Sequence, residues 1–339
     1  MRAVFLEAPG KLREAQVPVP RPGPGEVLVA VKAAGVCGSD LHYYEHGRLA
    51  TQVVTEPLVL GHEFAGELVE LGPDVTSLKV GDRVAVEPTV PCGRCSYCRS
   101  GRYNLCREMV CKGTPPSNHG AFREYVATPE TLAHKLPEGV SMEAGATVEP
   151  LSVGLHAVNR LDVRPGESVL VLGVGPIGLL AVASAAAAGA TGITAVDVVP
   201  MRLELAKRMG AARAVDAAAV DVAAELENSA DVVMDCAGTE TTMLQCYDVV
   251  KPGGRLAWIG MGCDQAAVPM MKAMSKELRI VTVFRYAGVY PKAVNLLAAG
   301  RIDVRPIITH RFGFPRVADA LAFASANRDR AAKTMVTFE

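Results

Sequence analysis

The stretch SVLVLGVGPIG, residues 168–178, decides the fold of the second half of the chain. A short apolar run typical of a buried strand leads into a turn with the pattern G-x-G-x-x-G, at Gly173, Gly175 and Gly178. An acidic residue, Asp197, follows Gly178 by 19 positions, at the end of the next apolar run. A strand, a glycine turn, a helix start and a distal carboxylate together form the fingerprint of a dinucleotide-binding βαβ unit.

Each residue of this fingerprint has a separate physical task. Gly173 permits the tight turn, Gly175 lets the backbone approach a pyrophosphate, and Gly178 lets the helix pack closely on the strand. The helix N-terminus offers free N–H groups to phosphate oxygens. Asp197 can accept hydrogen bonds from the adenosine ribose and would repel a 2′-phosphate, which favours NAD over NADP. Arg202 keeps NADP open as an alternative, because a nearby arginine can bind that phosphate.

Outward from this unit, apolar runs alternate with amphipathic runs. The predicted strands are 168–172, 192–197, 213–215, 231–235, 254–259 and 278–283, and the predicted helices are 177–188, 201–209, 220–227 and 239–250. Strands separated by helices imply a parallel, doubly wound sheet. The uncharged segment 168–196 could suggest a membrane span, but glycines interrupt it near both ends, which favours a buried strand–helix–strand unit.

Residues 1–150 have a different pattern. Their short apolar runs, such as VLVAVKAAGV (27–36), are bounded by Gly, Pro and Asp, which predicts a mostly β domain with long loops. A length of 339 residues suggests about two domains. The segment after residue 284 is too short for a third domain, so we expect it to return to the first.

Charge and targeting signals narrow the class of protein. A formal net charge of -1 argues against a broad nucleic-acid surface, which needs excess Lys and Arg on one face. The N-terminal stretch MRAVFLEAPGK lacks the apolar core of a signal peptide. We therefore expect a cytoplasmic protein that binds neither nucleic acid nor membrane.

Four of the nine cysteines gather in PCGRCSYCRSGRYNLC, residues 91–106. Without an export signal, such clustered thiols indicate metal ligands rather than disulfides. Four thiolates would satisfy a tetrahedral Zn²⁺ and leave no position open for chemistry, so this site is predicted to be structural. An iron–sulfur cluster is the alternative, weakened by the long gap before the last cysteine. The predicted zinc ligands are Cys92, Cys95, Cys98 and Cys106.

A second set of candidate metal ligands has three residues, one fewer than a closed tetrahedral site needs. Cys37 lies in AGVCGSDLHYYEHG, and His62 and Glu63 lie in VLGHEFAG. One thiolate, one imidazole and one carboxylate make a plausible zinc shell with an open position. The fourth ligand could be water, substrate or Glu149.

Several longer motifs resemble a known family when taken together. They are GVCGSDLHYYEHGR (35–48), LGHEFAG (60–66), the four-cysteine lobe, TPPSNHGAFREYV (114–126), VEPLSVGLHA (148–157), GVGPIG (173–178) and VFRYAGVYPKAVNLLAAGRI (283–302). Across nearly the whole chain they resemble the zinc-dependent medium-chain dehydrogenase/reductase superfamily, and most of all its polyol branch, the sorbitol and xylitol dehydrogenases.

This resemblance implies an architecture. A GroES-like β-barrel catalytic domain would comprise residues 1–152 and 285–339, and an inserted Rossmann domain, residues 153–284, would bind NAD. The resemblance also implies an interdomain cleft and a homotetramer.

The resemblance also implies roles for particular residues. Cys37, His62 and Glu63 would hold a catalytic zinc, with Glu149 reaching it directly or through bound water; alcohol dehydrogenases of the superfamily have a cysteine in that region. Ser39, His42 and Glu149 would pass on the hydroxyl proton. Polyol hydroxyls would contact Tyr43, Glu149, Arg285 and Tyr286. Besides the fingerprint residues, Ile177, Arg202, Ile259, Met261, Val283, Phe284 and Arg285 would line the cofactor.

The implied activity is reversible, NAD-dependent oxidation of a polyol secondary hydroxyl to the ketose, of the xylitol or sorbitol type. A threonine or 2,3-butanediol dehydrogenase is the near alternative, which FRYAGVYPKA and TPPSNHGAF disfavour. A binding protein without activity and a zinc-ribbon nucleic-acid binder are more distant alternatives. The first is disfavoured by the retained metal-ligand residues and the second by the near-neutral charge.

Overall fold

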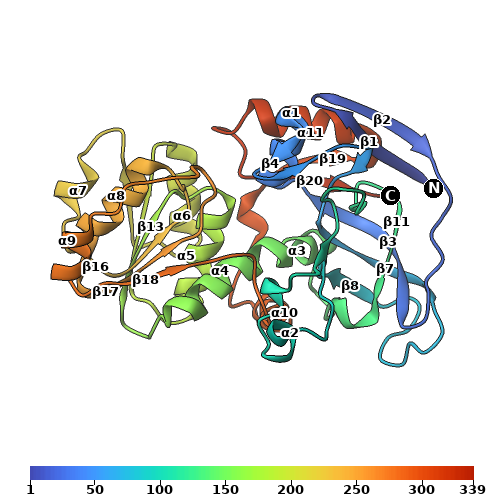
Figure 1. Cartoon of the computed structure of the whole chain (residues 1–339), viewed down its shortest axis with the longest axis horizontal. Coiled ribbons are helices and arrows are strands. Elements are labelled where there is room, and N and C mark those ends of the chain that lie inside the picture. The colour runs from blue at the N-terminus through green and yellow to red at the C-terminus, as the bar shows by residue number, and fades with distance from the viewer. The chain divides into compact units, whose positions relative to one another are not determined.

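The computed structural model describes all residues, 1–339, and they divide into two compact units (Figure 1). The first unit comprises Met1–Glu149, Tyr290–Ala298 and Ile308–Glu339, and the second comprises Pro150–Val289 and Ala299–Ile307. The segment 299–307, which the predicted boundaries assign to the catalytic domain, thus packs with the second unit.

A seven-stranded, mostly antiparallel sheet forms the centre of the first unit. Its strands are β12 (Ala133–Lys135), β8 (Arg83–Val86), β7 (Glu63–Leu71), β3 (Glu26–Gly35), β20 (Lys333–Thr337) and β19 (Ile308–Gly313) in spatial order, with β11 (Tyr125–Pro129) also paired to β3. The blue strand β3 and the red strand β20 in Figure 1 come from opposite ends of the chain and pair directly. This pairing holds the C-terminal segment in the first unit.

A smaller sheet completes the β core of the first unit. Strand β1 (Arg2–Ala8) pairs with β2 (Lys11–Gln16) on one side and with β6 (Leu58–Val59) on the other. Apolar side chains from both sheets, including Leu6, Leu58 and Phe64, form one buried cluster. The predicted mostly β, GroES-like domain is therefore present.

The second unit contains a six-stranded parallel sheet. Its spatial order is β15 (Arg213–Asp216), β14 (Gly192–Asp197), β13 (Ser168–Leu172), β16 (Ala230–Asp235), β17 (Val250–Trp258) and β18 (Arg279–Thr282). Numbered along the unit, this is the order 3-2-1-4-5-6 of a Rossmann fold. The predicted doubly wound sheet is confirmed, and the uncharged segment forms β13, α5 (Pro176–Ala187) and β14. No helix combines the length and the hydropathy that a membrane span requires.

The four predicted helices of this unit are present, one of them shorter than predicted, and two further helices, α4 (Val148–Leu161) and α9 (Met270–Ser275), were not predicted. Helices α6 (Pro200–Arg208) and α8 (Glu240–Val249) match the predicted ranges closely, but α7 covers only Val222–Glu225 of the predicted 220–227. Asp221 caps α7 by accepting from the N–H groups of Ala223 and Ala224, so the helix cannot begin earlier. Just beyond its end, Asn228 has a left-handed φ of 49° that no helix continues through.

Candidate active site and metal centres

The pairing of β3 with β7 brings three predicted ligands together. Gly35, the last residue of β3, lies opposite Glu63, the first residue of β7. Two residues beyond Gly35, Cys37 caps helix α1 (Gly38–His46). Donor atoms of Cys37, His62 and Glu63 lie within 4.8 Å of one another, although the chain separates the thiol from the other two by 25 residues or more. The sheet register therefore assembles a thiol, an imidazole and a carboxylate into one cluster.

Asp40, which the sequence predictions missed, orients two of these ligands. It is fully buried; Oδ2 accepts from the N–H of Cys37 at 3.0 Å, and Oδ1 accepts from the N–H of Gly61 at 3.0 Å. Oδ1 also lies 3.5 Å from Nδ1 of His62. A carboxylate behind one ring nitrogen is the usual way in which proteins fix the orientation of a metal-binding histidine. The sequence does contain a signal for Asp40. It is the third helical residue after Cys37, a position where an acidic side chain completes a capping box.

A buried lysine holds the third ligand. Nζ of Lys333 donates to both carboxylate oxygens of Glu63 at 2.7 Å and to the carbonyl of Val36 at 3.0 Å. The side chains of Lys333 and Glu63 are 2% and 1% exposed. Burial alone would lower the pKa of Lys333, but the charges of Glu63, Cys37 and Glu149 raise it above the usual value, so the ammonium is retained. A Cβ at Gly35 would stand 2.1 Å from Oε2 of Glu63, so glycine leaves room for this carboxylate.

The electrostatics of the cluster favour a cation. Burial disfavours a charged His62, yet Asp40 and Cys37 outweigh burial and raise the pKa of His62 well above its usual range. The site thus attracts positive charge, which a divalent ion would supply in place of the imidazole proton. A thiolate, an imidazole and a carboxylate are all ligands of Zn²⁺, and bonds of about 2.0–2.3 Å fit donors this close together. The residues therefore fit a catalytic zinc with an open position.

Glu149, the fourth candidate ligand, is not part of this cluster of donor atoms. It lies in the first turn of helix α4 (Val148–Leu161), is buried, and is close enough to Lys333 to raise the pKa of that lysine. Glu149 thus belongs to the same charged environment as Glu63.

Three further candidates follow Cys37 on helix α1. Ser39 and His42 are half-buried, and Tyr43 is fully buried with its hydroxyl donating to Oε1 of Gln52 at 2.8 Å. Ser39 and His42 thus occupy the first two turns of the helix that Cys37 caps. The remaining substrate candidates lie in the second unit. Arg285 there has a left-handed φ of 53° and places its guanidinium over the ring of Phe284, and Tyr286 is buried.

The four-cysteine lobe forms the second metal cluster. Donor atoms of Cys92, Cys95, Cys98 and Cys106 all lie within 4.8 Å of one another around the short helix α2 (Ser96–Arg99). The sulfur of Cys98 lies 4.0 Å from that of Cys92 and 3.5 Å from that of Cys95. Tetrahedral Zn–S bonds of about 2.3 Å place sulfurs about 3.8 Å apart, which these distances approach. Backbone N–H groups of Arg94 and Cys95 lower the pKa of Cys92 to about 6, which supplies the thiolate that a metal needs.

Substitution of one lobe cysteine should affect stability more than turnover. We expect Cys98→Ser to lower the melting temperature and the zinc content by one ion per chain, because a closed thiolate site contributes folding free energy. Turnover measured well below the melting temperature should stay within about threefold of the unmodified protein, because this metal has no open position. Loss of turnover with an unchanged melting temperature would contradict the assignment of the lobe as structural.

The glycine turn of the second unit has the geometry of a phosphate cradle. Gly173 has a left-handed φ of 79°, and a Cβ at Gly178 would stand 2.0 Å from the carbonyl oxygen of Gly173. Gly175, the cap of α5, has open space where a Cβ would point, and the helix behind it begins with Pro176. The unpaired N–H groups of this helix start face that space, so the residues fit a dinucleotide pyrophosphate.

Asp197 ends β14 beside this turn. Oδ2 accepts from the N–H of Val174 at 2.8 Å, and Oδ1 accepts from the N–H groups of Val198 and Val199 at 2.8 and 3.0 Å. Nη1 of Arg202 lies 3.6 Å from Oδ2, close enough to pair with the carboxylate. Asp197 therefore ties the glycine turn to the next loop and keeps Arg202 beside that turn.

The other predicted cofactor contacts lie on this unit as follows. Ile177 is in the first turn of α5, Ile259 and Met261 follow β17, and Val283 and Phe284 follow β18. Met261 and Phe284 are exposed. All five therefore lie at the carboxyl ends of strands or the amino end of a helix, where ligands of this fold bind.

Exchange of Asp197 should change cofactor preference. We expect Asp197→Ser to lower kcat/KM for NAD by about tenfold or more and to raise it for NADP, because the ribose loses its acceptor and Arg202 becomes available to a 2′-phosphate. Steady-state kinetics with both cofactors measures the ratio. Lys207→Met, on the exposed surface of the same helix as Arg202, is the matched control and should leave the ratio unchanged. An unchanged ratio in the Asp197 variant would contradict this role.

A three-ligand metal cluster on a GroES-like unit and a phosphate cradle on a Rossmann unit define a zinc- and dinucleotide-dependent oxidoreductase. Comparisons with known proteins agree. The family model "Alcohol dehydrogenase GroES-like domain" matches residues 23–138, and "Zinc-binding dehydrogenase" matches residues 176–299.

Comparison with individual proteins identifies the branch of the family. The chain is 45% identical to a sorbitol dehydrogenase of Arabidopsis thaliana over 94% of this chain and 90% of that protein. It is 42% identical to a probable D-xylulose reductase A of Aspergillus clavatus over 92% and 89% of the two chains. A crystal structure of an Escherichia coli oxidoreductase of unknown specificity superimposes with a TM-score of 0.95 at 35% identity, over 100% and 99% of the two chains. The chain belongs to the polyol branch of the zinc-dependent medium-chain dehydrogenase/reductase family.

Proposed function

We propose that this protein is an NAD-dependent zinc polyol dehydrogenase. It oxidises a secondary hydroxyl of a polyol of the xylitol or sorbitol type to the ketose, reversibly. The clustering of Cys37, His62 and Glu63 carries this proposal, because it supplies three protein ligands and an open position for a hydroxyl. The identity with the sorbitol dehydrogenase and with the D-xylulose reductase supports a polyol over threonine or 2,3-butanediol.

The roles of the protein groups follow from their positions. Cys37, His62 and Glu63 would hold a zinc ion, which would supply Lewis-acid stabilisation of negative charge on the substrate oxygen, and the second unit would hold NAD, which would supply the hydride acceptor. Asp40 and Lys333 keep the metal ligands in place through the hydrogen bonds described above. These hydrogen bonds to the metal ligands limit the motion of the ligands and so preserve the geometry that turnover needs.

Proton release and substrate recognition use the remaining polar groups. Ser39 and His42, two and five residues beyond Cys37, carry the hydroxyl proton toward solvent, and Glu149 is a second acceptor for it. Tyr43, Arg285 and Tyr286, together with Glu149, hydrogen-bond the other polyol hydroxyls, each of which is costly to leave unpaired in a closed site.

The second unit binds NAD. Gly173, Gly175 and Gly178 accommodate the pyrophosphate and Asp197 accepts from the ribose. The residues Ile177, Arg202, Ile259, Met261, Val283, Phe284 and Arg285 line the cofactor. Residues 1–152 and 285–339 then act as the catalytic domain, and residues 153–284 as the NAD-binding domain.

We also propose that the protein is a cytoplasmic homotetramer. An uncovered edge strand, β18, and the exposed methionines Met270, Met271 and Met274 of helix α9 (Met270–Ser275) support association between copies. Exposed apolar patches and free strand edges are typical of protein interfaces. Thiolate ligation of two metals requires reduced cysteines, which the cytoplasm maintains.

The function is tested by NADH formation with xylitol, sorbitol, galactitol, ribitol, threonine and 2,3-butanediol, together with metal analysis of the same sample. We expect a polyol to give the highest kcat/KM and two zinc ions per chain. A preference for threonine or 2,3-butanediol would contradict the polyol assignment, and absence of zinc would contradict the proposed chemistry.

A further inference from the structure

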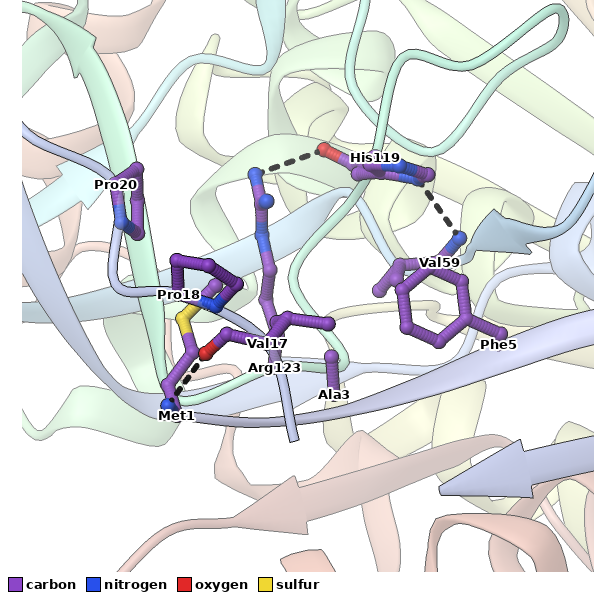
Figure 2. A pocket seen from close by; sticks show the side chains of 9 residues that line it. All are labelled: Met1, Ala3, Phe5, Val17, Pro18, Pro20, Val59, His119 and Arg123. Atoms are coloured by element: carbon purple, nitrogen blue, oxygen red, sulfur yellow. Dashed lines mark hydrogen bonds between the residues drawn. The ribbon is translucent and has the colours of Figure 1, made fainter. Parts of the chain in front are cut away.

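Two features of the fold lie outside the roles assigned above. The first is an open pocket in the first unit, beside Phe5, Val17 and Val59, whose wall offers almost no polar surface (Figure 2). The second is the carboxylate of Asp235, a residue that is 0% exposed at the end of β16 in the second unit. The wall of the pocket indicates no particular ligand, whereas the carboxylate lies among the residues of the cofactor site.

Asp235 lies where the order of strands in the parallel sheet reverses. Its strand, β16, pairs with β13, which leads into the glycine turn, and with β17, which leads to Ile259 and Met261. Asp197, at the end of β14, lies on the other side of β13, so the adenosine half of the cofactor belongs to that side of the turn. The nicotinamide half therefore belongs to the side of the turn on which Asp235 lies.

Asp235 connects the glycine turn with two further loops at this edge of the sheet. Oδ1 accepts from the N–H groups of Ala237 and Gly238 at 3.1 and 3.0 Å, and the backbone carbonyl of Asp235 accepts from the N–H of Ile259 at 2.9 Å. Ala237 packs on the glycine turn, since a Cβ at Gly173 would stand 2.6 Å from the Cβ of Ala237. These contacts fix the carboxylate beside residues that would line the cofactor.

The charge of this carboxylate has no cation to balance it. No lysine, arginine or histidine forms an ion pair with Asp235, and Oδ2 is buried without a hydrogen-bond partner. The hydroxyl of Thr242 is near enough to lower the pKa of Asp235, but it donates to the carbonyl of Thr239 at 3.1 Å. Burial raises the pKa of Asp235, and the N–H groups of Gly238 and Ala237 oppose that effect by stabilising the carboxylate.

The other ionisable groups that interact with Asp235 cannot offset its charge. They are the thiols of Cys236 and Cys246, and burial, followed by the charge of Asp235, raises the pKa of each above its usual value. Both thiols therefore stay protonated and neutral. A buried charge without a partner is costly, so a cationic group bound at this edge of the sheet would be stabilised by Asp235.

We propose, on the basis of the NAD-dependent function above, that the Asp235 carboxylate favours the oxidised cofactor over the reduced one. The nicotinamide ring carries a positive charge in NAD and none in NADH. The pyrophosphate is the same in both forms, so its repulsion by Asp235 cancels in the ratio of the two dissociation constants. The attraction of Asp235 for the charged ring does not cancel, and it shifts the equilibrium between the two bound forms toward NAD.

The test is fluorescence titration of the zinc-loaded full chain with NADH, followed by displacement with NAD, without substrate and at about pH 8, where carboxyl groups are ionised. Asp235→Asn removes the charge and keeps an oxygen that can accept from Ala237 and Gly238. We expect the dissociation constant for NAD, divided by that for NADH, to rise at least about fivefold. A purely structural role would weaken the binding of both cofactors by the same factor.

Two further variants accompany this measurement. Asp231→Asn is the matched control, because Asp231 begins four residues earlier on the same strand and pairs with Lys251 at 2.8 Å. Four strand residues place it about 13 Å from Asp235, so its ratio should stay within about twofold of that of the unmodified protein. Asp235→Ser also keeps an oxygen acceptor and removes the charge, so it should shift the ratio in the same direction and replaces Asp235→Asn if that variant does not fold.

An unchanged ratio in Asp235→Asn and Asp235→Ser would overturn the proposal, and so would an equal shift in Asp231→Asn. In either case both cofactors still bind, so the proposed function would stand without this role for Asp235. Failure of NAD and NADH to bind the unmodified protein would contradict the proposed function as well.

Discussion

Cys37→Ser and His62→Ala should each lower kcat for the best polyol by at least about a thousandfold. Each removes one of three protein ligands, and the Lewis-acid contribution of a bound metal is worth several kcal/mol, at about 1.4 kcal/mol for each factor of ten. The zinc content should fall from two ions per chain to one, because the four-cysteine lobe is untouched. NADH formation and metal analysis of the same preparations measure both effects.

The control for these variants is a cysteine outside both clusters. Cys263→Ser should keep both zinc ions and its turnover, since the Cys263 thiol belongs to neither metal cluster and lies 3.6 Å from the sulfur of Met243. Circular dichroism should show an intact fold in all three proteins, because neither Cys37 nor His62 contributes to the apolar core. A Cys37→Ser protein with near-normal turnover would show that the metal acts elsewhere.

Lys333→Met should lower the melting temperature by roughly 6–20 °C in the zinc-free protein. Removing one member of a buried ion pair costs about 3–5 kcal/mol, because the other charge remains buried without a partner, and each kcal/mol is worth about 2–4 °C in a unit of this size. Here the remaining charge is Glu63, whose carboxylate is 1% exposed. Thermal denaturation followed by circular dichroism measures the shift.

Two variants show whether this effect comes from the buried charge. Lys135→Met removes an ion pair with Asp82 at 2.6 Å, but Lys135 is 57% exposed, so we expect a loss of at most about 1 kcal/mol. Glu63→Gln combined with Lys333→Met should recover much of the lost stability, since no buried charge is left alone. If the double variant melts no higher than Lys333→Met, then packing of the lysine stem, and not pairing with Glu63, explains the loss.

The parts of the fold that local sequence determines could be predicted. Strand β13, the glycine turn and helix α5 follow from an apolar run, three glycines and a proline within eleven residues. The four lobe cysteines likewise lie within fifteen residues, so their spacing alone predicts a cluster. Neither end of α7 was predicted correctly, because capping by Asp221 at its start and the left-handed Asn228 beyond its end outweigh the helical pattern.

The long-range parts of the site could not be predicted from spacing. Lys333 meets Glu63 across 270 residues, through the pairing of β20 with β3 and of β3 with β7, and no local motif marks the lysine as a partner. Asp40 was within reach of prediction, since its position in the capping box is local.

Anomalous X-ray scattering at the zinc edge, from crystals of the protein, tests the central claim most directly. The account predicts two peaks per chain, one surrounded by Cys92, Cys95, Cys98 and Cys106 and the other coordinated by Cys37 and His62. A map with the lobe peak alone, and with the side chains of Cys37 and His62 directed apart, would contradict it.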